Sequence, residues 1–203
     1  MPPESPDPWI TTSTVLARLQ RFDDRDAWAA FVDRFRLPIQ RFARQQGLSE
    51  ADSEDVAQET LLGFAQAYRD QGFDRSKGRL SHWLFGIAWR RIDHVRRKGQ
   101  RVVAERTAAD DPTAFWAGVP DDAQASAAWN EVWETALMEH CLRRARSEVQ
   151  AQTYRAFELL VLEKRSVEEV AQELGITKNA VYIAKHRVAS RIKELVAELE
   201  DGA

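Results

Sequence analysis

Apolar residues recur at three- and four-residue steps along most of this 203-residue sequence, a spacing typical of amphipathic helices. Before residue 98 the pattern predicts a short amphipathic piece over residues 11–20 and longer helices over residues 24–45, 50–70 and 79–98. Helical spacing returns near residue 126 and continues to about residue 200. Because no segment shows the sustained alternation of a strand, the sequence predicts an all-α fold.

Turn and cap residues set the expected helix ends. Gly47 can end the helix over 24–45, and Ser49 can cap the next helix, with Asp52 at the position of a capping box. The core-facing stripes predicted for the three longer helices are Trp28, Phe31, Val32, Phe35, Ile39, Phe42 and Ala43, then Val56, Thr60, Leu61, Phe64 and Tyr68, then Leu80, Trp83, Leu84, Ile87, Ala88 and Val95.

The helical pattern stops between residues 99 and 125, where the chain carries two Asp pairs, prolines and no apolar stripe. Such a composition is typical of a linker. The predicted organisation is therefore a helical domain over 1–98, a linker over 99–125 and a second helical domain over 126–203. Within the second domain, interruptions are expected near Ser147, Arg165 and Gly175.

The stretch "VEEVAQELGITKNAVYIAKHRV" has the spacing of a helix-turn-helix. Ala171 is small where two helices would cross, Gly175 can adopt the left-handed turn conformation, and Val181 can anchor the second helix in a shared core. Thr177 can cap that second helix. The remaining apolar contacts expected in this motif are Val167, Val170, Leu174 and Ile176.

The second helix of this motif would present a polar and basic face outward. Burying Val181, Ala184, Val188 and Ile192 leaves the residues suited to base edges on the other side, namely Lys178, Asn179, Tyr182, Lys185, His186 and Ser190. The long side chains of Lys178 and Lys185 reach out from one flank, and Arg187 and Arg191 on the other flank suit phosphates. The alternative is a basic surface helix on an ordinary bundle.

Charge is strongly segregated although the net charge is only -3. Residues 50–59 hold five carboxylates and no base, whereas residues 75–106 hold ten Lys or Arg against Asp93 and Glu105. A basic block favours contact with phosphates, and an acidic block favours a basic protein surface. The alternative for either block is a solvated helix face.

Aromatic residues accompany the basic block. In the helix over 79–98, a helical wheel places Trp83 with the core stripe. It sends four residues to the other side, namely His82, Phe85, Trp89 and Arg96. Exposed rings beside cations suit stacking on unpaired bases. For Phe85 and Trp89, a protein contact or a second buried layer is the alternative.

Several classes of function are disfavoured. One cysteine, Cys141, and four scattered histidines match no metal-site spacing, and no glycine-rich phosphate loop or catalytic side-chain set stands out. We therefore expect no metal, no cofactor and no enzymatic activity. Neither a membrane-length apolar run nor a signal peptide is seen, which predicts a cytoplasmic protein without membrane insertion.

The sequence resembles bacterial RNA polymerase sigma factors of the extracytoplasmic-function (ECF) group. The stretch "LSEADSEDVAQETLLGFAQAYRDQGFDRSKGRLSHWLFGIAWRRIDHVRRK" is similar to their region 2, and "SVEEVAQELGITKNAVYIAKHRVASRIKEL" is similar to their region 4. The wording "AVYIAKHRV" resembles members from planctomycete-like bacteria. The segments similar to region 2 and region 4 occur in the same order as in the family. The resemblance therefore implies a transcription initiation factor with no catalytic role of its own.

The resemblance also implies partners and site residues. Docking on the clamp helices of the polymerase largest subunit would use Asp52, Asp55, Val56, Gln58 and Glu59. The minus-10 promoter element would meet Arg75, Lys77, Arg79, His82, Phe85, Trp89, Arg90, Arg96 and Arg97. The minus-35 element would be read by Thr177, Lys178, Asn179, Tyr182, Lys185, His186, Arg187 and Arg191.

Further partners follow from the family. The resemblance implies a contact with the polymerase beta flap and control by an anti-sigma factor or a kinase, with Ser49 and Ser53 as sites where phosphate would change the acidic helix. The acidic linker, with Asp110 and Asp121, would thread the polymerase. A conventional helix-turn-helix regulator, whose amino-terminal bundle senses a ligand or dimerises, is the alternative.

Overall fold

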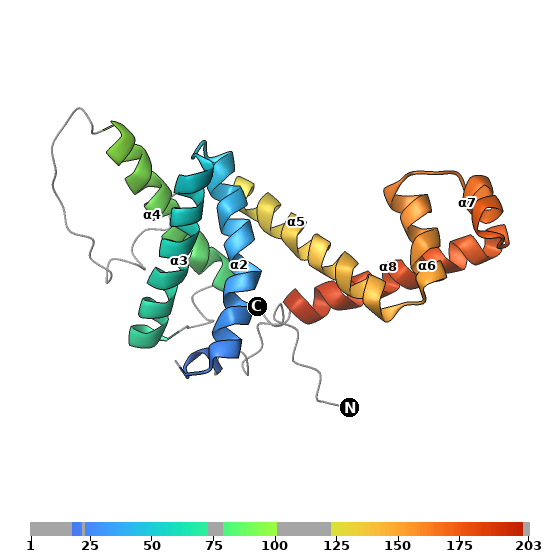
Figure 1. Ribbon diagram of the computed structural model, residues 1–203, viewed down its shortest axis with the longest axis horizontal. Coiled ribbons are helices and arrows are strands. Elements are labelled where there is room, and N and C mark those ends of the chain that lie inside the picture. Colours follow the sequence, from blue (N-terminus) through green and yellow to red (C-terminus); the bar gives the residue numbers. More distant parts are fainter. Residues whose placement is uncertain (1–17, 22, 73–78, 101–122, 201–203) are drawn as a thin grey trace. The chain divides into compact units, whose positions relative to one another are not determined.

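A computed structural model describes residues 18–21, 23–72, 79–100 and 123–200. Within these ranges every regular element is a helix and none is a strand, which confirms the all-α prediction. The described residues divide into two compact units, unit 1 (up to Glu134) and unit 2 (from Thr135 onward), and the division falls within one helix (Figure 1).

Unit 1 contains α2 (Arg25–Gln45), whose start is set by Asp24. The Asp24 carboxylate accepts a hydrogen bond from the Ala27 backbone N–H at 3.0 Å and pairs with Arg18 at 2.8 Å. These contacts satisfy one of the donors left open at a helix start. The predicted stripe of α2 is buried or half-buried, and Ile39 and Phe42 have no exposed surface.

The next helix, α3 (Glu50–Gln71), starts where the sequence predicts. The Ser49 hydroxyl accepts a hydrogen bond from the Asp52 backbone N–H at 3.1 Å, so the predicted cap is confirmed. All five members of the predicted α3 stripe are buried. The helix packs against both α2 and α4 (Leu80–Gln100), and in α4 the prediction that Trp83 belongs to the core is also confirmed, at 5% exposure.

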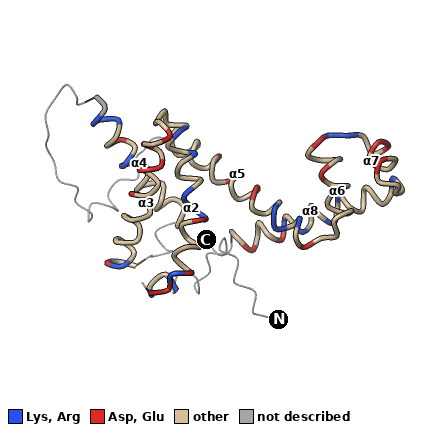
Figure 2. Tube along the Cα trace, viewed as in Figure 1, with Lys and Arg blue, Asp and Glu red and all other residues tan. Residues whose placement is uncertain are grey.

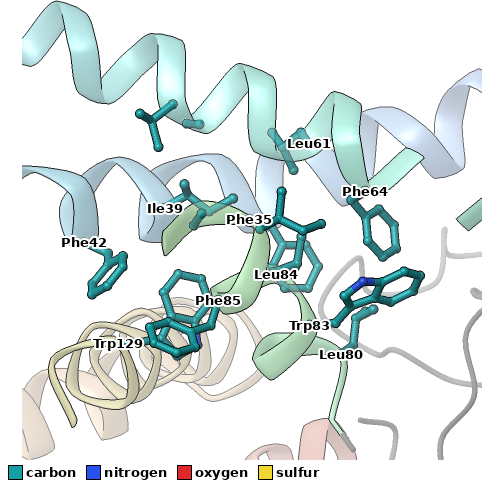
Figure 3. Packing of buried hydrophobic residues seen from close by; sticks show 14 of the residues in the cluster. Phe35, Ile39, Phe42, Leu61, Phe64, Leu80, Trp83, Leu84, Phe85 and Trp129 are labelled. Atoms are coloured by element: carbon teal, nitrogen blue, oxygen red, sulfur yellow. The ribbon is translucent and has the colours of Figure 1, made fainter. Parts of the chain in front are cut away.

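The core of unit 1 is completed by the first part of α5 (Ala123–Glu148). Trp129 is 1% exposed, and its ring lies 5.4 Å from that of Phe42 and 5.9 Å from that of Phe85 (Figure 3). One turn later Trp133 stacks on Phe35 at 5.2 Å. The start of α5 therefore belongs to the packed interior of unit 1.

This packing moves the division between the units away from the predicted position. The sequence predicts a linker to residue 125 and a second domain from 126, whereas the structure divides the chain between Glu134 and Thr135. The residues on either side of segment 101–122, Gln100 and Ala123, both lie in unit 1. The apolar residues of early α5 cause the difference, because their burial against α2 and α4 removes aromatic surface from water.

Unit 2 holds the rest of α5, then α6 (Ala151–Phe157), a π-helix η4 (Glu158–Leu162), α7 (Val167–Leu174) and α8 (Lys178–Glu200). Both α6 and α7 pack on α8. Its central cluster consists of Ala156, Leu159, Val170, Val181 and Ala184. The predicted interruptions near Ser147, Arg165 and Gly175 coincide with the ends of α5, η4 and α7.

Candidate nucleic-acid interface

The acidic face of unit 1 lies on α3. Asp52, Asp55, Gln58 and Glu59 are exposed, whereas Val56 is 1% exposed and belongs to the core. The exposed carboxylates differ in their partners: Glu59 lies 3.6 Å from Arg91, while Asp55 forms no ion pair within the described residues. Figure 2 shows acidic positions along α3 and basic ones toward the end of α4. Asp55 and Gln58 are thus available to a partner, and Val56 supports them from inside.

Phe85 is not at the surface, contrary to the expectation that it faces outward. Its side chain is 1% exposed, and Trp129 covers it (Figure 3). The helical wheel correctly places Phe85 on the side of α4 opposite its contact with α3. Early α5, however, covers part of that side. Phe85 is therefore a core residue and offers no ring to a base.

Trp89 is half-buried and packs against the core. Its ring lies 6.2 Å from that of Phe42, and the Arg96 guanidinium lies 5.7 Å from its centre, within the range of a cation–π contact. The same guanidinium donates a hydrogen bond to the Gln46 backbone carbonyl. Trp89 and Arg96 therefore join α4 to the end of α2 in addition to any contact with a ligand.

The other basic candidates of unit 1 that the structure describes are spread from the residue before α4 to the last turn of that helix. Arg79 and His82 are exposed at its amino-terminal end, and Arg90 is half-buried near the middle. Arg97 pairs with Asp93 four residues earlier. Arg75 and Lys77, like Asp110 and Asp121, lie outside the described residues.

The predicted helix-turn-helix of unit 2 is formed by α7 and α8 (Figure 1). Gly175 adopts a left-handed conformation, with φ 64° and ψ 32°, which a residue without Cβ reaches at little cost. Ser166 and Glu169 form a capping box at the start of α7, and the Thr177 hydroxyl accepts a hydrogen bond from the Ala180 backbone N–H at 3.1 Å. The turn, the Thr177 cap and the burial of Val181 are confirmed.

The outward face of α8 carries the polar residues that the sequence places there. Asn179, Tyr182, Lys185, His186 and Arg187 are all exposed. Lys178 is exposed as well, and its ammonium pairs with Glu168 at 2.6 Å. Since both side chains of that pair are more than half exposed, the pair costs little to open when a phosphate competes for the lysine.

Ile183 also lies on this face and was missed by the sequence reasoning. It is 59% exposed, between the buried Val181 and Ala184. An aliphatic residue in a helical pattern is usually taken for core, and Ile183 falls outside the three- and four-residue steps of the buried stripe. Its position outside the buried stripe is the signal that could have identified Ile183 as an exposed residue.

Arg191 is engaged within the protein, contrary to the expectation of a phosphate contact. Its guanidinium lies 2.5 Å from Glu148, 3.0 Å from Glu194 and 3.1 Å from Glu198. Glu148 also pairs with Arg144 at 2.8 Å. These acidic residues on α5 and α8 make the carboxyl-terminal half of α8 unfavourable for DNA phosphates, and Arg191 instead joins α8 to the end of α5.

We expect this network to make the stability of unit 2 depend on pH. The hydrogen bond from Arg191 lowers the pKa of Glu148 below its usual 4.5, against the opposing effect of partial burial. A carboxyl group whose pKa is lower in the folded chain stabilises the fold above the unfolded value, and this contribution disappears as the pH falls through the folded value. Glu148→Gln should therefore destabilise unit 2 at pH 7 and converge with the unchanged protein in acid.

The readout for this prediction must report on unit 2 alone. All seven tryptophans of the chain precede residue 135, so urea unfolding should be followed by pulsed hydrogen exchange in peptides of α6 and α8. A difference between Glu148→Gln and the unchanged protein that persists below the folded pKa would contradict the role given to ionised Glu148.

Within the described ranges no group of histidine, cysteine and carboxylate side chains could hold a metal ion. No described helix has the length and apolar character needed to cross a lipid bilayer.

An acidic helix face, a basic helix and a helix-turn-helix on an all-α fold are features typical of helical proteins that act on nucleic acid. More specifically, residues 31–101 match the family model Sigma-70 region 2. A comparison with curated proteins gives no match. The matched segment contains α3, α4 and most of α2, and the match supports a role in transcription initiation.

Proposed function

We propose that this protein is a sigma factor of the ECF group that binds core RNA polymerase in the cytoplasm and directs it to promoters. The observation that carries the proposal is the Sigma-70 region 2 match over residues 31–101, because this segment contains both the acidic face of α3 and the basic helix α4. The protein would bind and position its partners and catalyse no reaction.

Polymerase docking is assigned to the exposed carboxylates of α3. Asp55 and Gln58 lie on the outward side of a helix whose inward stripe fixes its orientation. A rigid acidic face complements a basic partner surface, and complementary charge speeds encounter and fixes register. The partner surface would be the clamp helices of the polymerase largest subunit, with a further contact between unit 2 and the beta flap.

Promoter contact is assigned to two places. At the start of α4, exposed Arg79 and His82 would meet the minus-10 element. In unit 2, the exposed amino-terminal half of α8, from Lys178 to Arg187, would enter the major groove at the minus-35 element.

Regulation by an anti-sigma factor or by phosphorylation of Ser49 is part of the same proposal. The Ser53 hydroxyl is less suited to modification, because Ser53 is 1% exposed and bonds the Ser49 carbonyl.

A division of labour between the units follows from this assignment. Lys185→Ala and Arg187→Ala should each weaken promoter binding several-fold and reduce its salt dependence, because each removes one cation near the phosphates. Binding to core polymerase should be unchanged. The measurement is fluorescence anisotropy of promoter duplexes against salt concentration, together with polymerase co-purification.

Arg191→Ala serves as a matched control. It also removes one cation from α8, but this cation is held by Glu148, Glu194 and Glu198, so the salt dependence should stay as in the unchanged protein. Equal loss of polymerase and promoter binding in Lys185→Ala would contradict the proposed division. A chain that binds DNA but never polymerase would instead indicate a conventional transcriptional regulator.

A further inference from the structure

Ile183 is the most exposed of the large hydrophobic residues that the structure describes, at 59%. It is the sixth residue of α8 and therefore lies in the second turn of that helix. Neighbouring Val181 and Ala184 are 0% and 6% exposed, so the helix is firmly seated and Ile183 has no route into the core. Its exposure is fixed by the fold.

The neighbours of Ile183 one turn away along the helix are polar. On a helix, residues three and four positions apart lie side by side, which places Asn179 on one side of Ile183 and His186 and Arg187 on the other. All three are exposed. An apolar protein partner would have to strip water from an amide, an imidazole and a guanidinium to cover one isoleucine, which is unfavourable without new hydrogen bonds. The same groups find hydrogen-bond partners in a DNA major groove.

The charges along α8 limit which part of the helix can approach DNA. Ile183, His186 and Arg187 share an open hollow with Glu148 and Glu194 at its other end. Because carboxylates repel phosphates, duplex DNA would lie over the amino-terminal half of the helix, where Thr177, Lys178 and Asn179 also lie. Ile183 is at the centre of that half.

We infer that Ile183 recognises the 5-methyl group of a thymine in the major groove of duplex DNA. Thymine is the only base that offers a methyl group there, and apolar side chains are its usual protein contact. Asn179 and Arg187, with their hydrogen-bonding groups, would address bases or phosphates on either side. This inference rests on the proposed function, since it requires that α8 read duplex DNA.

Deoxyuridine in place of thymidine tests the inference directly, because it removes only the methyl group. The preferred duplex would first be selected from a random library with the full chain bound to core RNA polymerase. Each thymine of the selected site would then be replaced singly by deoxyuridine. Binding by the unchanged protein should weaken about fourfold at one position, the effect of burying one methyl group, and Ile183→Ala should bind both duplexes equally.

Leu162→Ala provides the matched control, since Leu162 is a 46% exposed aliphatic residue of the same unit outside α8. It should keep the full preference for thymine. Ile183→Ala that still distinguishes thymine from deoxyuridine, or an unchanged protein that distinguishes them at no position of a selected site, would overturn the inference alone. A library that yields no preferred sequence at the minus-35 position would overturn duplex reading by α8 and the inference with it.

Discussion

Asp55→Lys is expected to weaken binding to core RNA polymerase by at least tenfold while leaving the protein folded. Asp55 is exposed on α3, and the substitution breaks no ion pair within the described residues. In the complex it would place a cation against a basic surface, and such like-charge contacts cost several kcal/mol. The measurement is the dissociation constant for core polymerase, obtained by surface plasmon resonance at two salt concentrations.

Asp70→Lys is the appropriate control for this charge reversal. It makes the same change near the carboxyl-terminal end of α3, where the aspartate lies 3.4 Å from exposed Arg69, and it should leave polymerase affinity within about twofold. Unchanged affinity in Asp55→Lys would mean that docking uses another surface. Equal loss in both variants would indicate a general charge effect instead of a local contact.

Trp129→Ala is expected to lower the free energy of unfolding of unit 1 by about 3–5 kcal/mol. Trp129 is 1% exposed between Phe42 and Phe85, so its removal leaves a cavity in the aromatic core. Urea unfolding followed by tryptophan fluorescence suits the experiment, because all seven tryptophans precede unit 2.

The exposed neighbour Asn130 supplies the control, since Asn130→Ala should change stability by no more than about 0.5 kcal/mol. A loss of stability in Trp129→Ala establishes that early α5 is a structural part of the first unit. A stability equal to that of the unchanged protein would show that residues 123–133 are not a structural part of the first unit.

The sequence predicts the local features of this fold well. Ser49, Thr177 and Gly175 act through neighbours a few residues away, and the stripes of α2 and α3 depend only on the period of a helix. The errors arise where distant segments meet. Phe85 is covered by Trp129 and Arg191 is held by Glu148, contacts between residues more than 40 positions apart, and a helical wheel holds no information about them.

Two further errors left a trace in the sequence. An apolar stripe at helical spacing lies within or just after the predicted linker and consists of Ala125, Trp129 and Val132. Such a stripe indicates a helix that packs against a core. Val56 is predicted to lie both in the α3 core stripe and on the docking surface, and one side chain rarely does both. Its 1% exposure shows that it belongs to the core. The partners of Arg191 had no comparable local signal.

Run-off transcription tests the central claim most directly. Purified core RNA polymerase from the source organism would be incubated with a library of that organism's upstream regions, with this protein and without it. The account predicts discrete transcripts that appear only with the protein, that disappear with Asp55→Lys and that persist with Asp70→Lys. Identical transcript profiles with and without the protein, under conditions where it is folded, would contradict a role in promoter-directed initiation.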